Sequence, residues 1–325
     1  MKGVTSFMYK VYVTSDKWND LDLITRDMTD EFEVEVVAGA SPEEIVDKCK
    51  DADALLIGYE TVTNEVMDAL PNLKLIQFMA IGVEGIDLAH ARSKNIAVAN
   101  VPTYCLNEVA DHALALILSI NRRISQFNRS VEEGQWDIRL YPEITRLGES
   151  TVGLLGFGNI PRAVNKRLQA FGAKVIAYDP FLAKEVGEEH NVELVSLDEL
   201  MERSDYISSH LPLNKHTEKL INKDLFDKMK DGVVFINTSR GGVVDEEELI
   251  KAVDSGKISY AGLDVLVEEY PDIENHPLNH RDNVVFTPHV AYYSRNSERD
   301  LLVFAGRSVK DYLLGKQESV SIVNR

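Results

Sequence analysis

A strand, a tight turn and the start of a helix are encoded in one stretch of the chain, Thr151-Val152-Gly153-Leu154-Leu155-Gly156-Phe157-Gly158-Asn159-Ile160-Pro161. Glycine pairs alone are weakly diagnostic, because they occur in many turns. Here an apolar strand precedes the glycines, a helix follows them, and a second strand ends in Asp179, roughly 20 residues beyond Gly156. This context is typical of a dinucleotide-binding unit, in which Gly156 permits the turn and Gly158 lets the backbone approach a pyrophosphate at the helix N-terminus.

The acidic residue and the proline of this region refine the expected ligand. Asp179 would accept hydrogen bonds from a ribose diol, and its charge would repel a 2′-phosphate, so NAD is favoured over NADP. Pro161 stands where the third glycine of the fingerprint is expected. A proline is tolerated in the first helical turn, since its missing N–H has no partner there, but its ring predicts a slightly displaced helix. An ordinary strand-to-helix turn without a ligand is the alternative.

The length and composition suggest a globular protein of about two domains. The chain has 325 residues, of which 44% are hydrophobic, and 53 acidic against 35 basic residues give a net charge of −18. Such a surface repels phosphate backbones and anionic lipids, so we expect neither nucleic-acid nor membrane-surface binding. An anionic small ligand would need a local positive group to override this field.

The chain shows no targeting or metal-binding pattern. No run of about 18 apolar residues could span a bilayer, and residues 1–8 are too polar for a signal peptide, so we expect a cytoplasmic protein. Cys49 and Cys105 cannot form a disulfide framework and lack a neighbouring Cys or His at a metal-ligand spacing. We interpret both as reduced, buried thiols and predict no metal site.

Short apolar strands alternate with helix-length segments, which predicts parallel crossover units. The fold class expected is therefore α/β, with two Rossmann-like doubly wound parallel-sheet domains and a cleft between them. A closing amphipathic helix is predicted over 298–314. The first series of predicted strands covers 9–14, 54–58, 75–78 and 97–100, and the second covers 151–155, 174–178, 206–207, 233–237, 260–264 and 284–287.

A long helix predicted over 107–123 is apolar nearly all round, which indicates burial against more than one surface. Two interpretations stay open at this point. The helix is either a core element between domains or a contact between two copies of the chain. The second interpretation underlies our expectation of a homodimer.

Titratable residues follow the last three predicted strands. Arg240, Glu269 and His289 each come shortly after one of these strands. In an open α/β sheet, ligands bind beyond the carboxyl ends of the strands, so these residues should converge on one site. Taken singly, each has an ordinary interpretation as a surface salt bridge, a solvated acid or a satisfied histidine.

Four motifs, in order along the chain, resemble the signatures of the D-isomer-specific 2-hydroxyacid dehydrogenases. They are the glycine turn, Asn237 to Asp245, Leu263 to Glu269 and Thr287 to His289. Residues 100–112 and 287–294 resemble the branch that includes C-terminal-binding-protein-like dehydrogenases. The resemblance covers nearly the whole chain. It implies a discontinuous substrate-binding domain, residues 1–101 and 294–325, and an NAD-binding domain, residues 102–293.

The resemblance implies that a 2-oxo acid and a D-2-hydroxy acid are interconverted by hydride transfer with NAD. His289 would be the general acid for reduction and the base for the reverse direction, because imidazole titrates near neutral pH. Glu269 would hydrogen-bond the other ring nitrogen and fix its tautomer. Arg240 would hold the carboxylate and carbonyl of the substrate through its planar fork.

The same resemblance implies which residues contact the two ligands. The backbone of Ile81, Gly82 and Val83 would bind the substrate carboxylate together with Arg240. The residues implied around the cofactor are Gly156, Gly158, Asn159, Ile160, Asp179, Pro180, His210, Leu211, Pro212, Thr217, Thr238, Ser239 and Asp264.

Two departures from the family pattern affect what is carried over. Relatives usually have proline directly after the catalytic glutamate, whereas here Pro271 follows Glu269 after one intervening residue, which makes Glu268 a second candidate. Asn159 stands where relatives often carry an arginine beside the pyrophosphate, so one positive charge is missing.

Aromatic residues at three positions suggest the kind of substrate. Phe78, Tyr104 and Tyr292 would wall a pocket for an apolar or aromatic side chain. This hypothesis fails if activity is highest with glyoxylate or hydroxypyruvate.

A regulator that senses NAD(H) and binds a partner peptide on the same fold is the competing function. Such regulators retain residues like Arg240, Glu269 and His289. Formate dehydrogenases carry glutamine where Glu269 stands, and long-form phosphoglycerate dehydrogenases have a C-terminal domain that 325 residues do not provide. The activities of short phosphoglycerate, glycerate and lactate dehydrogenases are all compatible with the sequence.

Overall fold

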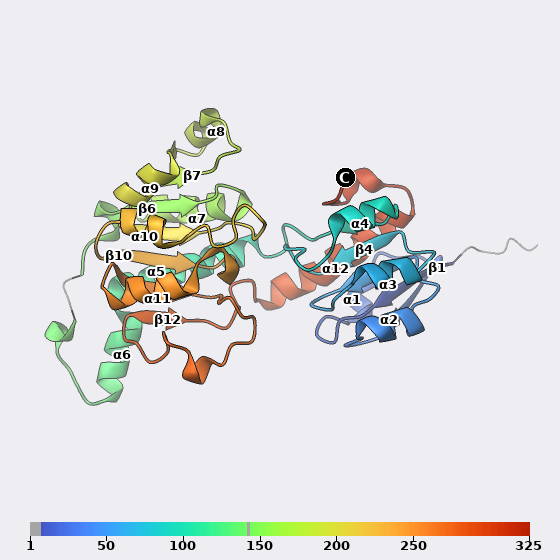
Figure 1. Ribbon diagram of the computed structural model, residues 1–325, viewed down its shortest axis with the longest axis horizontal. Coiled ribbons are helices and arrows are strands. Elements are labelled where there is room, and N and C mark those ends of the chain that lie inside the picture. The colour runs from blue at the N-terminus through green and yellow to red at the C-terminus, as the bar shows by residue number, and fades with distance from the viewer. Residues whose placement is uncertain (1–7, 142–143) are drawn as a thin grey trace, which may run out of the picture. The chain divides into compact units, whose positions relative to one another are not determined.

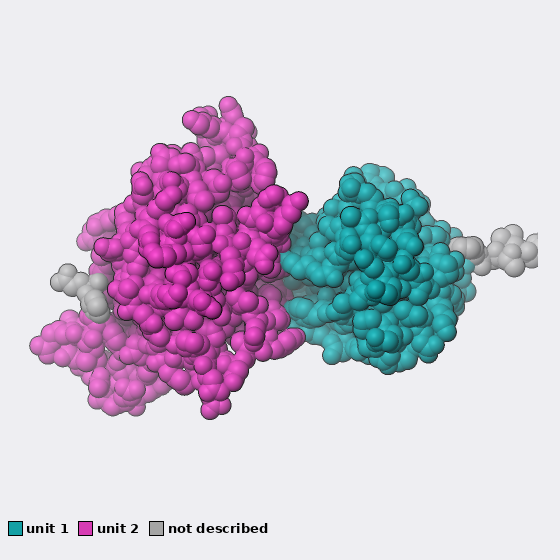
Figure 2. Space-filling model, viewed as in Figure 1, with its two compact units in different colours: residues 1–104, 294–325 teal, residues 105–293 magenta. Residues whose placement is uncertain are grey.

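The computed structural model describes residues 8–141 and 144–325, and the chain divides into two compact units. Unit 1 consists of Met1–Tyr104 and Ser294–Arg325, and unit 2 consists of Cys105–Tyr293 (Figure 2). Of the polar N-terminal stretch 1–8, all but Met8 lies outside the described residues.

Unit 1 is built on a parallel sheet of five strands in the order β2-β1-β3-β4-β5. Figure 1 labels β1 and β4 of this sheet. This is the flavodoxin-like doubly wound order. Its strands are β1 Tyr9–Val13, β2 Phe32–Val36, β3 Ala54–Ile57, β4 Leu75–Phe78 and β5 Ala97–Ala99. Its helices are α1 Leu21–Ile24, α2 Pro42–Lys48, α3 Asn64–Ala69, α4 Leu88–Ser93 and α12 Arg295–Leu313, with a 3-10 turn η5 at Gln317–Ser319.

Unit 2 is built on a parallel sheet of seven strands in the order β12-β11-β10-β9-β6-β7-β8. The first six strands along the chain follow the Rossmann order, and β12 extends the sheet beyond β11. The strands are β6 Thr151–Leu155, β7 Lys174–Tyr178, β8 Glu193–Leu194, β9 Tyr206–Ser209, β10 Val233–Asn237, β11 Ile258–Leu263 and β12 Val284–Phe286.

The helices of unit 2 cover both faces of its sheet. They are α5 Leu106–Arg122, α6 Ile124–Glu132, α7 Asn159–Ala170, α8 Lys184–Glu189, α9 Leu197–Arg203, α10 Lys223–Lys228 and α11 Glu246–Asp254, with 3-10 turns η1 Ile138–Leu140, η2 Leu147–Glu149, η3 Gly241–Val243 and η4 Ile273–Asn275. Val152 and Leu154 of β6 pack in a core with α5 and α7, whereas Leu155 packs in a second core with α9, α10 and α11. The alternation of side chains along a strand produces these two cores.

The predicted fold class of parallel α/β domains is confirmed, and the structure adds two strands. β2 was not predicted, although its alternation of apolar residues with Glu33 and Glu35 is the pattern of a strand with one exposed face. β8 was not predicted, because it has only two residues at the sheet edge. Within the described ranges, no helix combines the length and apolarity needed to cross a membrane.

One expectation about the long helix of unit 2 was wrong. α5 is not apolar all round, because Asn107, Asp111, Ala115 and Arg122 form an exposed stripe at helical spacing. Its buried face packs against α7, β10 and β11. The helix is therefore amphipathic, with one face in the core of unit 2.

Candidate active site

Three neighbouring strands of unit 2 deliver the candidate catalytic residues. β10, β11 and β12 are adjacent and parallel, so their carboxyl ends lie at one edge of the sheet. Arg240 follows β10, Glu269 lies in the loop after β11, and His289 lies three residues beyond β12. The structure therefore brings these three segments to the same edge, as the strand-end argument predicts.

His289 and Glu269 form a direct pair. Nδ1 of His289 lies 2.7 Å from Oε1 of Glu269, so Glu269 and not Glu268 is the carboxylate that holds the imidazole. An ionised carboxylate can only accept, so Nδ1 carries the proton in this pair. The neutral ring then presents Nε2 as an acceptor, and the charged ring presents Nε2–H as a donor. The geometry thus leaves one nitrogen able to take up and release a proton.

The backbone at His289 is held in an unusual conformation. Its φ is 51°, in the left-handed region that non-glycine residues rarely adopt. The N–H of His289 donates to the carbonyl oxygen of Asp264 at 2.8 Å. The Asp264 carboxylate accepts from the Thr287 hydroxyl at 2.5 Å and from the N–H groups of Val290 and Ala291, both at 3.0 Å. The buried carboxylate of Asp264 therefore clamps the backbone on both sides of His289.

A small aromatic group lies beside the imidazole. The rings of His289 and Tyr292 make an edge-to-face contact with centroids 6.2 Å apart. Tyr292 is buried, and its ring contacts Tyr293 in the same edge-to-face manner, with centroids 6.4 Å apart. The tyrosine predicted at the substrate pocket thus lies against the candidate proton donor.

The loop that carries Arg240 is shaped by Asn237, the last residue of β10. The Asn237 side chain donates to the Arg240 carbonyl at 2.9 Å and accepts from the Ser239 N–H at 3.0 Å. A Cβ at Gly241 would lie 1.9 Å from the carbonyl oxygen of Leu266, so only glycine lets this loop touch the loop after β11. Asn237 was missed as a site residue, although an amide at the end of a buried strand is a usable signal.

A second missed residue supports the loop that carries Glu269. Oε2 of Glu246, the first residue of α11, accepts from the Val267 N–H at 3.1 Å. Oε1 of Glu246 also lies 3.5 Å from Nε2 of His276, farther along the same loop. No local sequence pattern could have found this contact, because the residues it joins lie on different elements.

The glycine turn after β6 has the geometry that a dinucleotide needs. Gly156 has a φ of 86°, and a Cβ there would lie 3.1 Å from the carbonyl oxygen of His210. Gly158 is the N-cap of α7, and a Cβ added to it would meet no heavy atom of the described chain within 4 Å. Pro161 is the third residue of α7, where the helix makes no use of an N–H.

Asp179 ties this turn to the end of β7. Its Oδ2 accepts from the Phe157 N–H, and its Oδ1 accepts from the Phe181 N–H, both at 3.0 Å. Each carboxylate oxygen has a further lone pair, so the side chain can still accept from a ribose hydroxyl. The carboxylate thus shapes the turn and presents a negative charge at the position predicted for the ribose.

Other residues predicted around the cofactor lie at neighbouring strand ends. Burial lowers the pKa of His210 to about 3, so this imidazole is neutral, and its Nε2 lies 3.0 Å from the Ser208 hydroxyl. The Thr238 hydroxyl is buried without a hydrogen-bond partner within the described chain. An unsatisfied buried hydroxyl and the open space at Gly158 both fit a polar ligand held at this edge.

The remaining cofactor candidates also lie in unit 2. Ser239 donates to Asn237, and Thr217 donates to the Pro212 carbonyl at 2.5 Å. Asn159 and Ile160 open α7, Pro180 follows Asp179, and Leu211, Pro212 and Thr217 lie in the loop after β9. In residues 8–141 and 144–325, no three His, Cys, Asp or Glu residues form a group that could hold a metal ion.

Most of the residues predicted to contact the substrate belong to unit 1. Ile81, Gly82 and Val83 lie half-buried in the loop between β4 and α4, where the Ile81 carbonyl accepts from the Asn100 side chain at 2.6 Å. Phe78 packs within the core of unit 1. Tyr104, the last residue of the first segment of unit 1, is also buried.

Comparison with known proteins assigns the family. The model described as "D-isomer specific 2-hydroxyacid dehydrogenase, NAD binding domain" matches residues 114–291, which is more than half of the chain. The chain belongs to the D-isomer specific 2-hydroxyacid dehydrogenase family. The matched residues all lie in unit 2 and include the glycine turn, Arg240 and His289. NAD is the cofactor of this family domain.

Relatives and solved structures of the family share much of the chain. A D-3-phosphoglycerate dehydrogenase of Archaeoglobus fulgidus is 42% identical over 268 residues, which cover 82% of this chain and 50% of the relative. A hydroxypyruvate reductase of Blautia hydrogenotrophica is 36% identical over 289 residues, covering 87% and 88%. A D-lactate dehydrogenase of Aquifex aeolicus, solved with NAD and lactic acid, superposes with a TM-score of 0.87 at 29% identity, covering 97% and 99%. The chain thus spans only about half the length of the phosphoglycerate dehydrogenase.

Proposed function

We propose that this protein is an NAD-dependent oxidoreductase that interconverts a 2-oxo acid and a D-2-hydroxy acid. The observation that carries the proposal is the pairing of His289 with Glu269 at 2.7 Å, at the sheet edge where Arg240 also emerges. The glycine turn and Asp179 in the same unit supply a place for NAD. A proton donor, an anion-binding cation and a hydride carrier are the three components that this reaction needs.

The paired residues account for the proton. In the direction of reduction, the charged His289 would donate its Nε2 proton to the carbonyl oxygen of the substrate, and NADH, when bound, would supply the hydride. Glu269 accepts from Nδ1–H and stabilises the imidazolium before transfer. In the reverse direction the neutral Nε2 accepts the hydroxyl proton. The same hydrogen bond therefore serves both directions.

Arg240 accounts for substrate binding. Its guanidinium donates to the Ser239 carbonyl at 2.8 Å, which steadies the side chain. The planar fork matches a 2-oxo carboxylate, and it supplies the local positive charge that the acidic chain needs to hold an anion. We assign the substrate-binding role to unit 1 as well, through the backbone of Ile81, Gly82 and Val83. By the family resemblance, we also assign substrate contact to the aromatic residues Phe78, Tyr104 and Tyr292.

The cofactor-contacting role extends along the strand ends of unit 2. Asp179 would take the ribose hydroxyls, and the N-terminus of α7 at Gly158 would take the pyrophosphate. Thr238 would find the partner that its buried hydroxyl lacks within the described chain. The neutral His210 would line the cofactor without adding charge.

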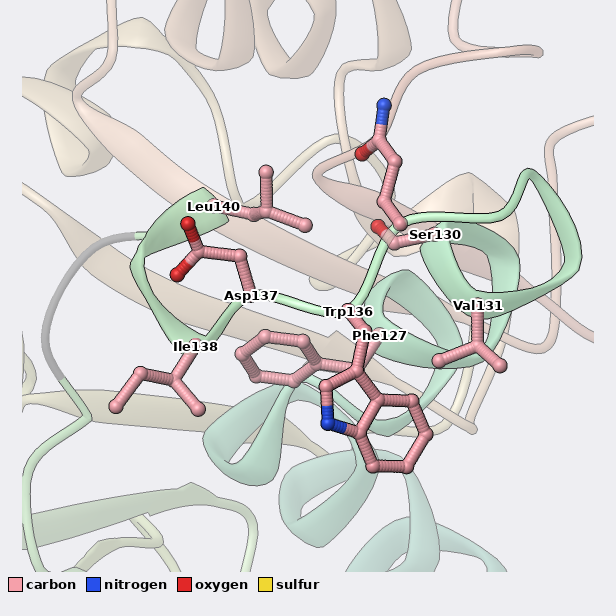
Figure 3. A pocket seen from close by; sticks show the side chains of 8 residues that line it. Phe127, Ser130, Val131, Trp136, Asp137, Ile138 and Leu140 are labelled. Carbon is pink, nitrogen blue, oxygen red and sulfur yellow. The ribbon is translucent and has the colours of Figure 1, made fainter.

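We further propose that the protein is a cytoplasmic homodimer. Its two cysteines are buried thiols, which suits a reducing compartment. Large apolar side chains gather on the surface just after α6, where Trp136 is 91% and Ile138 is 87% exposed. Together with Phe127 they line a mostly apolar pocket of about 240 Å³ (Figure 3). An exposed apolar pocket walled by large side chains suits a two-fold contact, in which the same surface of each copy covers that of the other.

Sedimentation of the purified protein tests the dimer. Trp136→Ser is expected to shift the protein toward monomer. Phe181→Ser removes another exposed aromatic, 92% exposed, from a different part of unit 2 and should leave the dimer intact. A monomeric wild type, or equal behaviour of the two variants, would contradict the assignment of this surface.

A substrate panel tests the function. Purified protein with NADH should oxidise the cofactor in the presence of at least one 2-oxo acid, and the aromatic residues predict a preference for apolar or aromatic side chains. NADH that binds but is not oxidised with any panel member would overturn the enzyme proposal. A maximum with glyoxylate or hydroxypyruvate would overturn only the aromatic pocket.

A further inference from the structure

A histidine on α5 reaches the segment that holds His289. Nε2 of His112 lies 2.9 Å from the Thr287 hydroxyl and 3.5 Å from Oδ1 of Asp264. The contact joins residues 175 positions apart in the chain. Within α5, whose inner face is otherwise largely apolar, His112 is the polar side chain directed at the strand ends of β11 and β12.

Counting protons fixes the direction of these hydrogen bonds. The Thr287 hydroxyl has a single proton, which it donates to Oδ1 of Asp264 at 2.5 Å. Toward His112 the same oxygen can only accept. His112 must therefore carry a proton on Nε2 and donate it to Thr287. A chain of donors runs from His112 through Thr287 to Asp264.

The end of this chain is a buried negative charge. The Asp264 side chain has no solvent exposure and accepts from Thr287, Val290 and Ala291. A buried carboxylate needs every available donor, because an unsatisfied charge in the interior is costly. The Nε2–H of His112 lies 3.5 Å from Oδ1, and its partial positive charge further stabilises this carboxylate.

The hydrogen bonds to Asp264 hold the strained backbone of His289 in place. The left-handed φ of 51° persists only if the surroundings fix it. Thr287 on one side and Val290 and Ala291 on the other are both attached to Asp264. If Thr287 were released, the segment could relax toward ordinary backbone angles and move the imidazole relative to Glu269.

We propose that His112 is a positioning residue for His289, acting through Thr287 and Asp264. The proposal rests on the proposed function for its kinetic consequence, because the step affected is proton transfer by His289. It assigns the donor on α5 a role in the reaction, although His112 itself touches neither reacting atom.

Paired substitutions test whether the donor matters. His112→Leu removes the Nε2 donor, whereas His112→Gln places an amide N–H near the same point. We expect His112→Leu to lower kcat by roughly 10- to 100-fold with little change in KM for NADH, as a small displacement of a catalytic group does. His112→Gln should recover most of the loss. Thr287→Val and Thr287→Ser should repeat this contrast.

A spectroscopic readout separates this proposal from the proposed function. In protein labelled with ¹⁵N-histidine, the Nδ1–H proton of His289 bound to Glu269 should give a downfield resonance. His112→Leu should shift or broaden that resonance while the Tm stays close to that of His112→Gln. If the wild type reduces no 2-oxo acid, the proposed function fails but this comparison still applies. An unchanged resonance in His112→Leu, or equal losses of kcat in the Leu and Gln variants, would overturn the positioning role.

Discussion

Both units are doubly wound parallel sheets, but they differ at the point where the strand order of the sheet reverses. In unit 2 the strand order reverses between β6 and β9, and the turn after β6 is left open at Gly158. In unit 1 the order reverses between β1 and β3. There a Cβ at Gly58, directly after β3, would lie 2.9 Å from the Ser15 hydroxyl and 3.2 Å from the Trp18 ring. The Gly58 N–H is itself bonded to the Glu60 carboxylate at 2.6 Å.

This difference shows that the fold supplies a position for a ligand but does not make it a site. Open α/β sheets bind ligands where the strand order reverses. Unit 1 fills that position with Trp18, which is 4% exposed, and with its own carboxylate. Unit 2 leaves space there and places titratable residues at the adjoining strand ends. Function must therefore be argued from the residues at these points.

The largest expected effect separates two histidine–carboxylate pairs, one in each unit. His289→Gln should lower kcat by roughly 100- to 10,000-fold, because it removes the proton donor, and should leave NADH affinity nearly unchanged. His90, whose Nε2 lies 3.0 Å from Oδ1 of Asp68 in unit 1, is the matched control. His90→Gln should keep full activity. Steady-state kinetics and NADH fluorescence titrations check both variants. Similar losses of kcat in the two variants would contradict a catalytic role specific to His289.

The next effect concerns cofactor choice at the end of β7. Asp179→Asn removes the charge but keeps an oxygen that can accept from the Phe157 N–H. We expect the preference for NADH over NADPH to fall by roughly 10- to 100-fold, since a hydrogen bond to a charged group is lost and repulsion of a 2′-phosphate ends. The ratio of kcat/KM for the two cofactors measures this. A preference that does not change would show that Asp179 serves only to shape the turn.

A pair of glycine substitutions compares the two reversal points directly. Gly158→Ala should lower NADH affinity about 10-fold with little loss of stability, because its Cβ meets no protein atom within 4 Å. Gly58→Ala should instead cost about 1–3 kcal/mol of unfolding free energy and leave NADH affinity unchanged, because its Cβ meets Ser15 and Trp18. Denaturant unfolding and NADH titration distinguish them. The reverse pattern would contradict the account of both units.

The last prediction leaves activity near neutral pH untouched and concerns a pH dependence of stability that resides in unit 2. Burial lowers the pKa of His210 from 6.5 to about 3 in the folded protein. Between these two pH values the unfolded chain therefore binds a proton at this residue and the folded chain does not. The unfolding free energy should therefore fall as the pH drops from 6.5 toward 3, by at most about 1.4 kcal/mol per pH unit. His210→Asn should flatten this part of the curve. Parallel curves for wild type and variant would contradict the buried neutral imidazole.

Much of the fold follows from apolar runs that are buried on both faces. Ala54–Ile57 and Leu75–Phe78 are wholly buried strands, and such continuous runs are typical of parallel sheets. Phe32–Val36 shows the other strand pattern, in which Glu33 and Glu35 alternate with apolar residues, so a search restricted to continuous apolar runs misses it. The strand forms because it pairs with β1, a contact that the local sequence does not encode.

Some residues of the candidate site could be predicted from the local sequence, whereas others depend on contacts between residues that are far apart in the chain. Glu269 and His289 could be selected because each follows a strand and the family resemblance assigns them roles. The contact of His112 with Thr287, and that of Glu246 with Val267, were not predictable, because each joins residues brought together only by the folded sheet. Strand ends indicate where chemistry occurs, and the folded sheet determines which residues support it.

We propose that unit 2 carries out hydride transfer to C2 of a 2-oxo acid with His289 as the proton donor. The most direct measurement uses NADH deuterated at the transferable C4 hydrogen, with the best 2-oxo acid of the panel, followed by mass spectrometry and chiral separation of the product. We expect a D-2-hydroxy acid that carries one deuterium at C2, and His289→Gln should form it far more slowly. A product of the L configuration, or one without deuterium at C2, would contradict it.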